Sequence, residues 1–215
     1  MNLVLLCDFD GTITNLDTAF FLLDKFVEGD WRTFDSQYRE GKITLEECIQ
    51  EQYSMFTVPK HLMLKELEKA VSFRSNFSKL VDYCRMQDIS FTIVSAGLDF
   101  VINHFLKQKG FANSIKVYSV KTTITENGIK LAFPKLLDKD SADFKDDLVR
   151  YHKKQGSRVI YIGDGTSDYQ AIKKADYRFS IKNSRLAGLC RENKISHKQI
   201  DDFQEVINAL KILIR

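Results

Sequence analysis

The chain has 215 residues, 44% of them hydrophobic and 28% charged, which suits a medium-sized domain, or a core with an inserted lobe, and argues against a disordered chain. Its net charge of +3 is too small and too dispersed to predict the clustered basic face of a nucleic-acid-binding protein. No apolar stretch approaches the roughly 20 residues that cross a bilayer. We therefore expect no membrane partner and no export. The cysteines are far apart and form no C-x-x-C pair, which predicts reduced thiols and a cytoplasmic location.

The first predicted element is a strand over residues 3–6, an unbroken apolar run. Because successive side chains of a strand point to opposite faces, such a run indicates a strand that is covered on both sides. Asp8-Phe9-Asp10-Gly11-Thr12 follows this strand at once. Ligands of open α/β sheets bind at the carboxyl ends of the strands, so Asp8 and Asp10 stand where a functional site is expected.

Residues 16–85 contain helical patterns and no convincing strand. Apolar residues recur at helical spacing in 18–27, Thr44 and Glu47 form a predicted capping box, and Val58-Pro59 opens another helix. The pattern predicts an α-helical cap over residues 16–85, inserted into a catalytic core made of residues 1–15 and 86–215.

After the insert, strand and helix patterns alternate. We predict strands over residues 90–94, 158–162 and 177–181, and helices over residues 98–109, 142–154 and 201–214. Asn127-Gly128, a strong hairpin signal, predicts a small antiparallel β-hairpin within residues 116–133. The fold class is therefore α/β: a Rossmann-like, doubly wound parallel sheet with an inserted α-helical cap and a small β-hairpin.

Polar residues recur where the later strands end. Ser95-Ala96-Gly97 follows the strand over residues 90–94, and Asp164 and Asp168 follow the strand over residues 158–162. Clustered carboxylates repel one another, and a hard divalent cation such as Mg²⁺ compensates them. A serine and a lysine would supply donors for phosphoryl oxygens, so this combination favours phosphoryl transfer.

At this point the chain resembles a known family. Asp8-x-Asp10-Gly11-Thr12, Ser95-x-Gly97, a lysine and Gly163-Asp164-x-x-x-Asp168 are similar, in this order, to the four motifs of the haloacid dehalogenase superfamily of phosphatases. The chain resembles its phosphoserine phosphatase-like branch. The large insert, the small hairpin and residues 43–48 are also similar to the methionine-salvage phosphatases that act on 2-hydroxy-3-keto-5-methylthiopentenyl phosphate.

The resemblance implies a role for each matching residue. Asp8 would be the nucleophile that becomes an aspartyl phosphate, and Asp10 would protonate the leaving group and then activate water. Mg²⁺ would be held by the Asp8 side chain, the Asp10 carbonyl and Asp164, with Asp168 as a ligand or an orienting residue. The implied phosphate-binding residues are Ser95, Ala96, Gly97 and Lys145.

Two assignments stay open at this stage. Lys145 matches the family's placement of the lysine, but Lys135 and Lys139 are rivals. Asp17 lies nine residues after Asp8, where the phosphoserine phosphatase pattern has a glutamate that pairs with the substrate's ammonium, and the shorter acid leaves that role open.

The resemblance implies a Mg²⁺-dependent phosphatase whose partner is a small-molecule phosphomonoester, since a cap covers the site. A phosphomutase and a non-catalytic module that binds a cation or phosphate are the alternatives. The substrate and the oligomeric state stay open.

Overall fold

A computed structural model describes residues 2–125 and 128–214. Within these residues, six strands form one parallel sheet in the order β3-β2-β1-β6-β7-β8. The strands are β1 (Leu3–Cys7), β2 (Ser90–Ser95), β3 (Lys116–Ser119), β6 (Arg158–Gly163), β7 (Tyr177–Ile181) and β8 (Lys198–Ile200). The predicted doubly wound parallel sheet is confirmed.

The central strand of this sheet is β1, whose five residues are all buried. It lies between β2 and β6, and Cys7 pairs in register with Ile93 on one side and Ile162 on the other. The carboxyl ends of the three strands are therefore at nearly the same height. This alignment brings residues that follow β1, β2 and β6 to one edge of the sheet.

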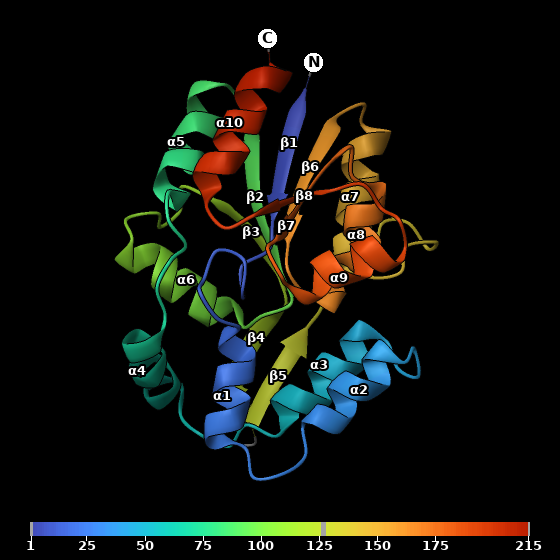
Figure 1. The fold of residues 1–215 in the computed structure, drawn as a ribbon. Helices are drawn as coiled ribbons and strands as arrows, with labels where there is room; N and C mark the ends of the chain where they lie inside the picture. The colour runs from blue at the N-terminus through green and yellow to red at the C-terminus, as the bar shows by residue number, and fades with distance from the viewer. Residues whose placement is uncertain (1, 126–127, 215) are drawn as a thin grey trace.

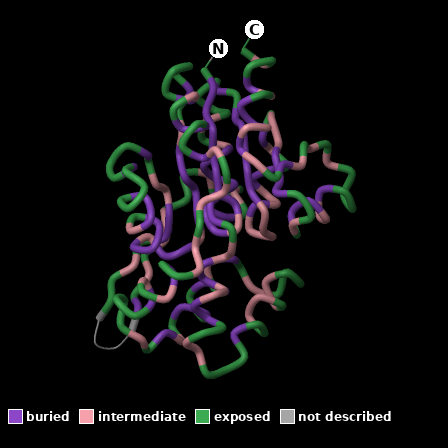
Figure 2. Tube along the Cα trace, turned by 60° about the vertical axis from the view of Figure 1, so that its left-hand side comes forward, coloured by how far each residue is buried: buried purple, intermediate pink, exposed green. Residues whose placement is uncertain are grey.

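Helices cover both faces of the sheet. The helices α5 (Phe77–Met86) and α10 (Phe203–Leu213) pack together on one side, whereas α7 (Phe144–Lys154) and α8 (Tyr169–Lys174) lie on the other (Figure 1). The sheet strands between them are the most continuously buried part of the chain (Figure 2). Helix α6 (Asp99–Gln108), the short helix η1 (Thr166–Asp168) and α9 (Arg185–Glu192) complete the core. Over residues 2–125 and 128–214, no helix combines the length and the apolar character needed to span a bilayer.

The remaining elements lie beyond the carboxyl ends of the strands, away from both termini (Figure 1). They are α1 (Thr18–Phe26), α2 (Arg32–Arg39), α3 (Leu45–Ser54), α4 (Lys60–Ala70) and the antiparallel hairpin β4 (Lys121–Thr125) and β5 (Gly128–Ala132). The predicted capping box starts α3: Thr44 Oγ1 accepts from the Glu47 N–H at 3.1 Å, and Glu47 Oε2 accepts from the Thr44 N–H at 2.7 Å. The hairpin is confirmed, and β5 contacts α3. Asn127, at its predicted turn, lies outside the described residues.

Part of the predicted hairpin segment belongs elsewhere. Residues 116–119 form β3, which pairs in parallel with β2 and extends the main sheet, so only residues 121–132 make the hairpin. The hairpin signal gives the turn but not how far its strands extend, and tertiary pairing with β2 decided that. The sequence patterns also do not predict α9 and β8, which are short and contribute few periodic positions.

The division into core and cap stays a prediction. The last helix of the predicted insert, α5, packs against β2 and α10 of the sheet layer. The first four helices lie at the opposite end of the molecule from the termini (Figure 1).

Candidate active site

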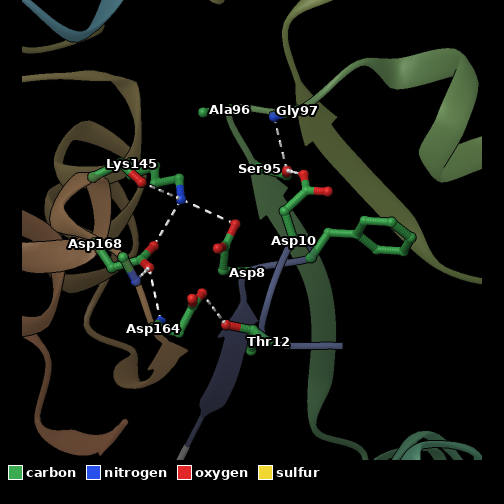
Figure 3. Close-up of polar contacts among 12 residues, drawn as sticks. Asp8, Asp10, Thr12, Ser95, Ala96, Gly97, Lys145, Asp164 and Asp168 are labelled. Carbon is green, nitrogen blue, oxygen red and sulfur yellow. Dashed lines mark hydrogen bonds and ion pairs between the residues drawn. The ribbon is translucent and has the colours of Figure 1, made fainter. Parts of the chain in front are cut away.

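The centre of the site is an ion-pair cluster around Lys145. Its Nζ donates to Asp8 Oδ1 at 3.0 Å, to Asp168 Oδ1 at 2.7 Å and to Ser167 Oγ at 3.1 Å (Figure 3). Burial by itself lowers the pKa of Lys145, but the Asp168 and Asp8 carboxylates beside it raise that pKa above its ordinary value. The ammonium is therefore charged and held between two acids.

Lys145 is the second residue of α7, so the start of this helix places its side chain in the site. Asp143 caps this helix, with Oδ1 accepting from the Asp146 N–H at 2.8 Å. The rival residues Lys135 and Lys139 are exposed and do not line the pocket described below. Of the three candidate lysines, the structure brings only Lys145 to the predicted acids.

Asp168 has donors on both carboxylate oxygens. Oδ1 accepts from Lys145 and from the buried Tyr161 hydroxyl at 2.8 Å. Oδ2 accepts from the backbone N–H groups of Asp164 and Gly165 at 3.0 and 2.9 Å. With four donors directed at it, this carboxylate is suited to orienting its neighbours.

Asp164 completes an acidic triad. Carboxylate oxygens of Asp8, Asp164 and Asp168 lie within 4.8 Å of one another. Asp164 Oδ1 accepts from Thr12 Oγ1 at 2.8 Å. Burial and the neighbouring Asp168 raise the pKa of Asp164 to about 7, and burial followed by Asp168 also raises the pKa of Asp8 well above its usual range. A cluster of buried oxygens with too little positive charge fits a hard divalent cation such as Mg²⁺.

The side chain of Asp10 faces a different set of partners. Its Oδ2 accepts from Ser95 Oγ at 3.3 Å, and Ser95 Oγ accepts from the Gly97 N–H at 3.0 Å (Figure 3). Its Oδ1 accepts from the Thr18 N–H at 3.1 Å and from the Thr18 hydroxyl. Burial raises the pKa of Asp10 above its ordinary value, and the Thr18 hydrogen bonds oppose that shift. The sequence analysis missed Thr18, because nothing in a threonine at the start of a helix links it to Asp10.

Two glycines allow this close packing. A Cβ on Gly97 would overlap Asp10 Oδ2 and would lie 3.2 Å from Ser95 Oγ. Gly11 has a φ of +70°, and a Cβ there would overlap Asp164 Oδ2. The predicted motifs need glycine at these positions because carboxylates occupy the space of a side chain.

A pocket of about 250 Å³ opens onto these groups. All predicted site residues line it except Asp168, which is fully buried. Helices α1, α2 and α3 line the opposite side with apolar and polar side chains: Ala19, Phe20, Asp35, Tyr38, Arg39, Leu45, Cys48, Ile49, Gln52 and Tyr53. Sequence patterns place these residues on helices but do not show which of them face the pocket.

Asp17 and Tyr53 line the pocket from the helices that face the sheet. Asp17 lines the pocket and also caps α1, since its Oδ1 accepts from the Phe20 N–H at 2.8 Å. Burial and the nearby Asp10 raise the pKa of Asp17 well above its usual range. The Tyr53 hydroxyl donates to the Ala96 carbonyl at 3.2 Å. The Tyr53 hydrogen bond thus joins α3 to the loop that follows β2.

The comparisons with known proteins agree with this geometry. A profile of the haloacid dehalogenase-like hydrolase family matches residues 5–173. The chain therefore belongs to this family. The resemblance predicted from its motifs is confirmed, as is the prediction of a hydrolase.

Among the chain's curated relatives are the 2-hydroxy-3-keto-5-methylthiopentenyl-1-phosphate phosphatases of Bacillus cereus (strain B4264) and Bacillus cytotoxicus. They are 26% and 27% identical to this chain over 219 residues, and each alignment covers 100% of this chain and 98% of the relative.

Solved structures share the fold. A phospho-aspartyl intermediate analogue of phosphoserine phosphatase has a TM-score of 0.70 at 16% identity, covering 97% of this chain and 98% of that one. A phosphoserine phosphohydrolase-like protein from Francisella tularensis has a TM-score of 0.67 at 19% identity, covering 97% and 99%.

The glycine contact gives a first prediction. Gly97→Ala places a methyl group against Asp10 and is expected to lower kcat/KM for an aryl phosphate by about 100-fold, because misplacement by about 1 Å has that effect. Gly188→Ala is the control, since the nearest atom to its Cβ is Glu192 Oε1 at 4.0 Å. Steady-state kinetics with unfolding curves measures both; equal kcat/KM in the two variants would contradict the steric argument.

Asp143 gives a second prediction. Burial raises the pKa of its carboxyl from 3.8 to about 6. The folded state therefore binds more protons than the unfolded state between about pH 4 and 6, and the free energy of unfolding decreases as the pH rises through this window. Asp143→Asn keeps an oxygen to cap α7 and removes the titration. The stability of the wild type relative to this variant should fall by up to about 3 kcal/mol from pH 4 to 7.

Urea denaturation at several pH values in the presence of a chelator measures this difference. Asp82→Asn, which removes an exposed carboxylate from α5, is the control. A difference between wild type and Asp143→Asn that stays constant with pH would show that Asp143 does not titrate in this range.

Proposed function

We propose that the chain is a Mg²⁺-dependent phosphatase that hydrolyses a small phosphomonoester through a phosphorylated Asp8. The observation that carries the proposal is the contact of Asp8 with Lys145 beside Asp164, at the floor of a pocket that also holds Asp10.

Asp8 is oriented for nucleophilic attack. Its Oδ1 accepts from Lys145, while no described residue donates a hydrogen bond to its Oδ2. We propose that Oδ2 attacks phosphorus, forming an acyl phosphate as the bond between phosphorus and the leaving oxygen breaks. A carboxylate attached to a fully buried central strand moves little, which favours a fixed geometry of attack.

Asp10 would complete both half-reactions. Its raised pKa favours the protonated carboxyl that donates a proton to the leaving oxygen. The resulting carboxylate would then take a proton from water, and the hydroxide would attack phosphorus, releasing phosphate and regenerating Asp8. Thr18 and Ser95 hold the two oxygens of Asp10 in place for these transfers.

The phosphoryl oxygens need donors. We propose that Lys145, the Ser95 hydroxyl and the N–H groups of Ala96 and Gly97 bind them. These groups line the same pocket as Asp8. They would stabilise negative charge on the phosphoryl group as it is transferred.

The oxygens of Asp8 and Asp164, with the Asp10 carbonyl, are proposed to hold Mg²⁺, and Asp168 to orient them. When bound, the ion would neutralise charge between the nucleophile and the phosphoryl group. The donor set suits it, since it contains only oxygen and none of its members is more than partly exposed.

The leaving group is proposed to be a small, largely apolar metabolite. The cap wall contains Phe20, Leu45, Cys48 and Ile49, which suits an apolar tail such as that of the 2-hydroxy-3-keto-5-methylthiopentenyl-1-phosphate named for the Bacillus relatives. Asp17 favours a second candidate, phosphoserine, because its carboxylate on the pocket wall could pair with an ammonium.

We also propose a cytoplasmic location, consistent with four buried, free cysteines in the described residues.

A nucleophile variant tests the reaction. Asp8→Asn is expected to lower the turnover of p-nitrophenyl phosphate at least about 1,000-fold, since removing a catalytic nucleophile has effects of that size or larger. Asp82→Asn should retain full activity.

Mg²⁺ should raise the melting temperature of the wild type and should do so much less for Asp164→Asn, a measurement that does not depend on turnover. Undiminished hydrolysis by Asp8→Asn would remove Asp8 as the nucleophile, and a module that only binds a cation would show Mg²⁺ stabilisation without turnover.

A substrate panel tests the leaving group. Methylthio-containing keto-enol phosphates should give a higher kcat/KM than phosphoserine, because the cap wall is mainly apolar. Asp17→Asn should lower activity on phosphoserine more than on an uncharged alkyl phosphate. Release of inorganic phosphate distinguishes hydrolysis from transfer: an isomerised sugar phosphate as the main product would instead identify a phosphomutase.

A further inference from the structure

Two chain segments connect the cap to the sheet, and they lie side by side. Residues 11–17 lead into α1, and residues 71–76 return from α4 to α5. Thr14 and Phe73 form an antiparallel bridge, the Asn15 N–H donates to the Ser72 carbonyl at 2.9 Å, and the Arg74 N–H donates to the Ile13 carbonyl at 2.7 Å. The returning segment is thus joined to the turn that follows Asp8 and Asp10.

The Arg74 side chain adds a second connection to the same turn. Its Nε donates to the Thr12 carbonyl at 2.9 Å and its Nη2 to the Gly11 carbonyl at 2.9 Å. Its Nη1 reaches the Asp201 carbonyl at 3.3 Å. Among the described residues, no carboxylate forms an ion pair with this guanidinium. Its N–H groups donate to backbone carbonyls instead, and two of these carbonyls belong to consecutive residues, which suits the planar fork of arginine.

These two carbonyls belong to the residues that fix the spacing of the site. Gly11 adopts the left-handed region, with a φ of +70°, and its missing Cβ leaves space for Asp164. The Thr12 hydroxyl donates to Asp164 at 2.8 Å. A rotation of the Gly11 or Thr12 peptide would therefore change the position of Asp164 relative to Asp10 and Asp8.

The returning segment is itself anchored to the core. The Phe203 N–H donates to the Ser75 carbonyl at 3.2 Å, and Asn76 Nδ2 donates to the Asp202 carboxylate at 2.8 Å. The Phe73 ring packs edge-on against Phe9, with 5.9 Å between ring centroids. Arg74 therefore acts on the turn from a fixed base.

We propose that Arg74 is a positioning residue for the nucleophile turn: by binding the Gly11 and Thr12 carbonyls it sets the separation of Asp10 and Asp164. Arg74 does not line the pocket, so it acts through the turn and not on the substrate. This inference rests on the proposed function, in which these acids carry the reaction.

The test compares two arginines that make the same kind of contact. Arg178 also donates to backbone carbonyls, those of Ala175, Ser196 and Lys173, but near the start of β7, away from the carboxyl ends of the strands. Arg74→Gln is expected to lower kcat for p-nitrophenyl phosphate by about 10- to 100-fold with KM changed less than about threefold, since the turn and not the binding groups is displaced. Arg178→Gln should leave kcat within about twofold.

A second measurement follows the turn directly. Hydrogen exchange of a peptide covering residues 9–16 should be faster in Arg74→Gln than in the wild type and in Arg178→Gln, because the Gly11, Ile13 and Thr14 N–H groups are hydrogen-bonded within this turn. A variant that is only less stable overall would exchange faster throughout the chain.

Arg74→Lys keeps the charge but not the fork, and is expected to recover only part of kcat. If Arg74→Gln does not fold, the same measurements of kcat and hydrogen exchange on Arg74→Lys test the inference. Wild-type kcat and exchange in the folded Arg74 variant would overturn the inference and leave the proposed function intact, whereas an active Asp8→Asn would overturn the proposed function itself.

Discussion

The structure depends on keeping several carboxylates close together at the end of a buried strand. Asp8, Asp164 and Asp168 share this position with one ammonium group, that of Lys145. Burial disfavours the charged form of the Asp164 carboxyl and the neighbouring Asp168 adds repulsion, so the pKa of Asp164 is raised to about 7. The cluster is therefore short of positive charge, and this shortage is what suits it to a hard divalent cation.

The remaining fold supplies the rigidity that such a cluster needs. Parallel pairing of β1 with β2 and β6 sets the carboxyl ends of three strands level, so that Asp8, Ser95 and Asp164 face one pocket. The backbone N–H groups that follow β6 hold Asp168. Hydrogen bonds thus orient each acid, with the buried Lys145 ammonium shared between Asp8 and Asp168.

The helices between β1 and β2 contribute to the site. Thr18, at the start of α1, donates to Asp10, and Tyr53 of α3 donates to the Ala96 carbonyl. The same helices supply apolar and polar side chains to the wall of the pocket opposite the acids. Residues from the sheet and residues from these helices therefore form the pocket together.

The sequence by itself determined the parallel α/β core, because apolar runs report burial on both faces, and it identified the acids because they follow those runs directly. It also favoured Lys145, whose spacing before the last motif matched the family. Only the tertiary structure decided that β3 joins the main sheet, and that Thr18, Tyr53 and Arg74 hydrogen-bond to residues of the predicted motifs. The physical reason is the separation of the residues along the chain. Periodicity and turn chemistry are local, whereas the contact of Arg74 with Thr12 joins residues far apart in the chain. It exists only once residues 11–17 and 71–76 lie side by side.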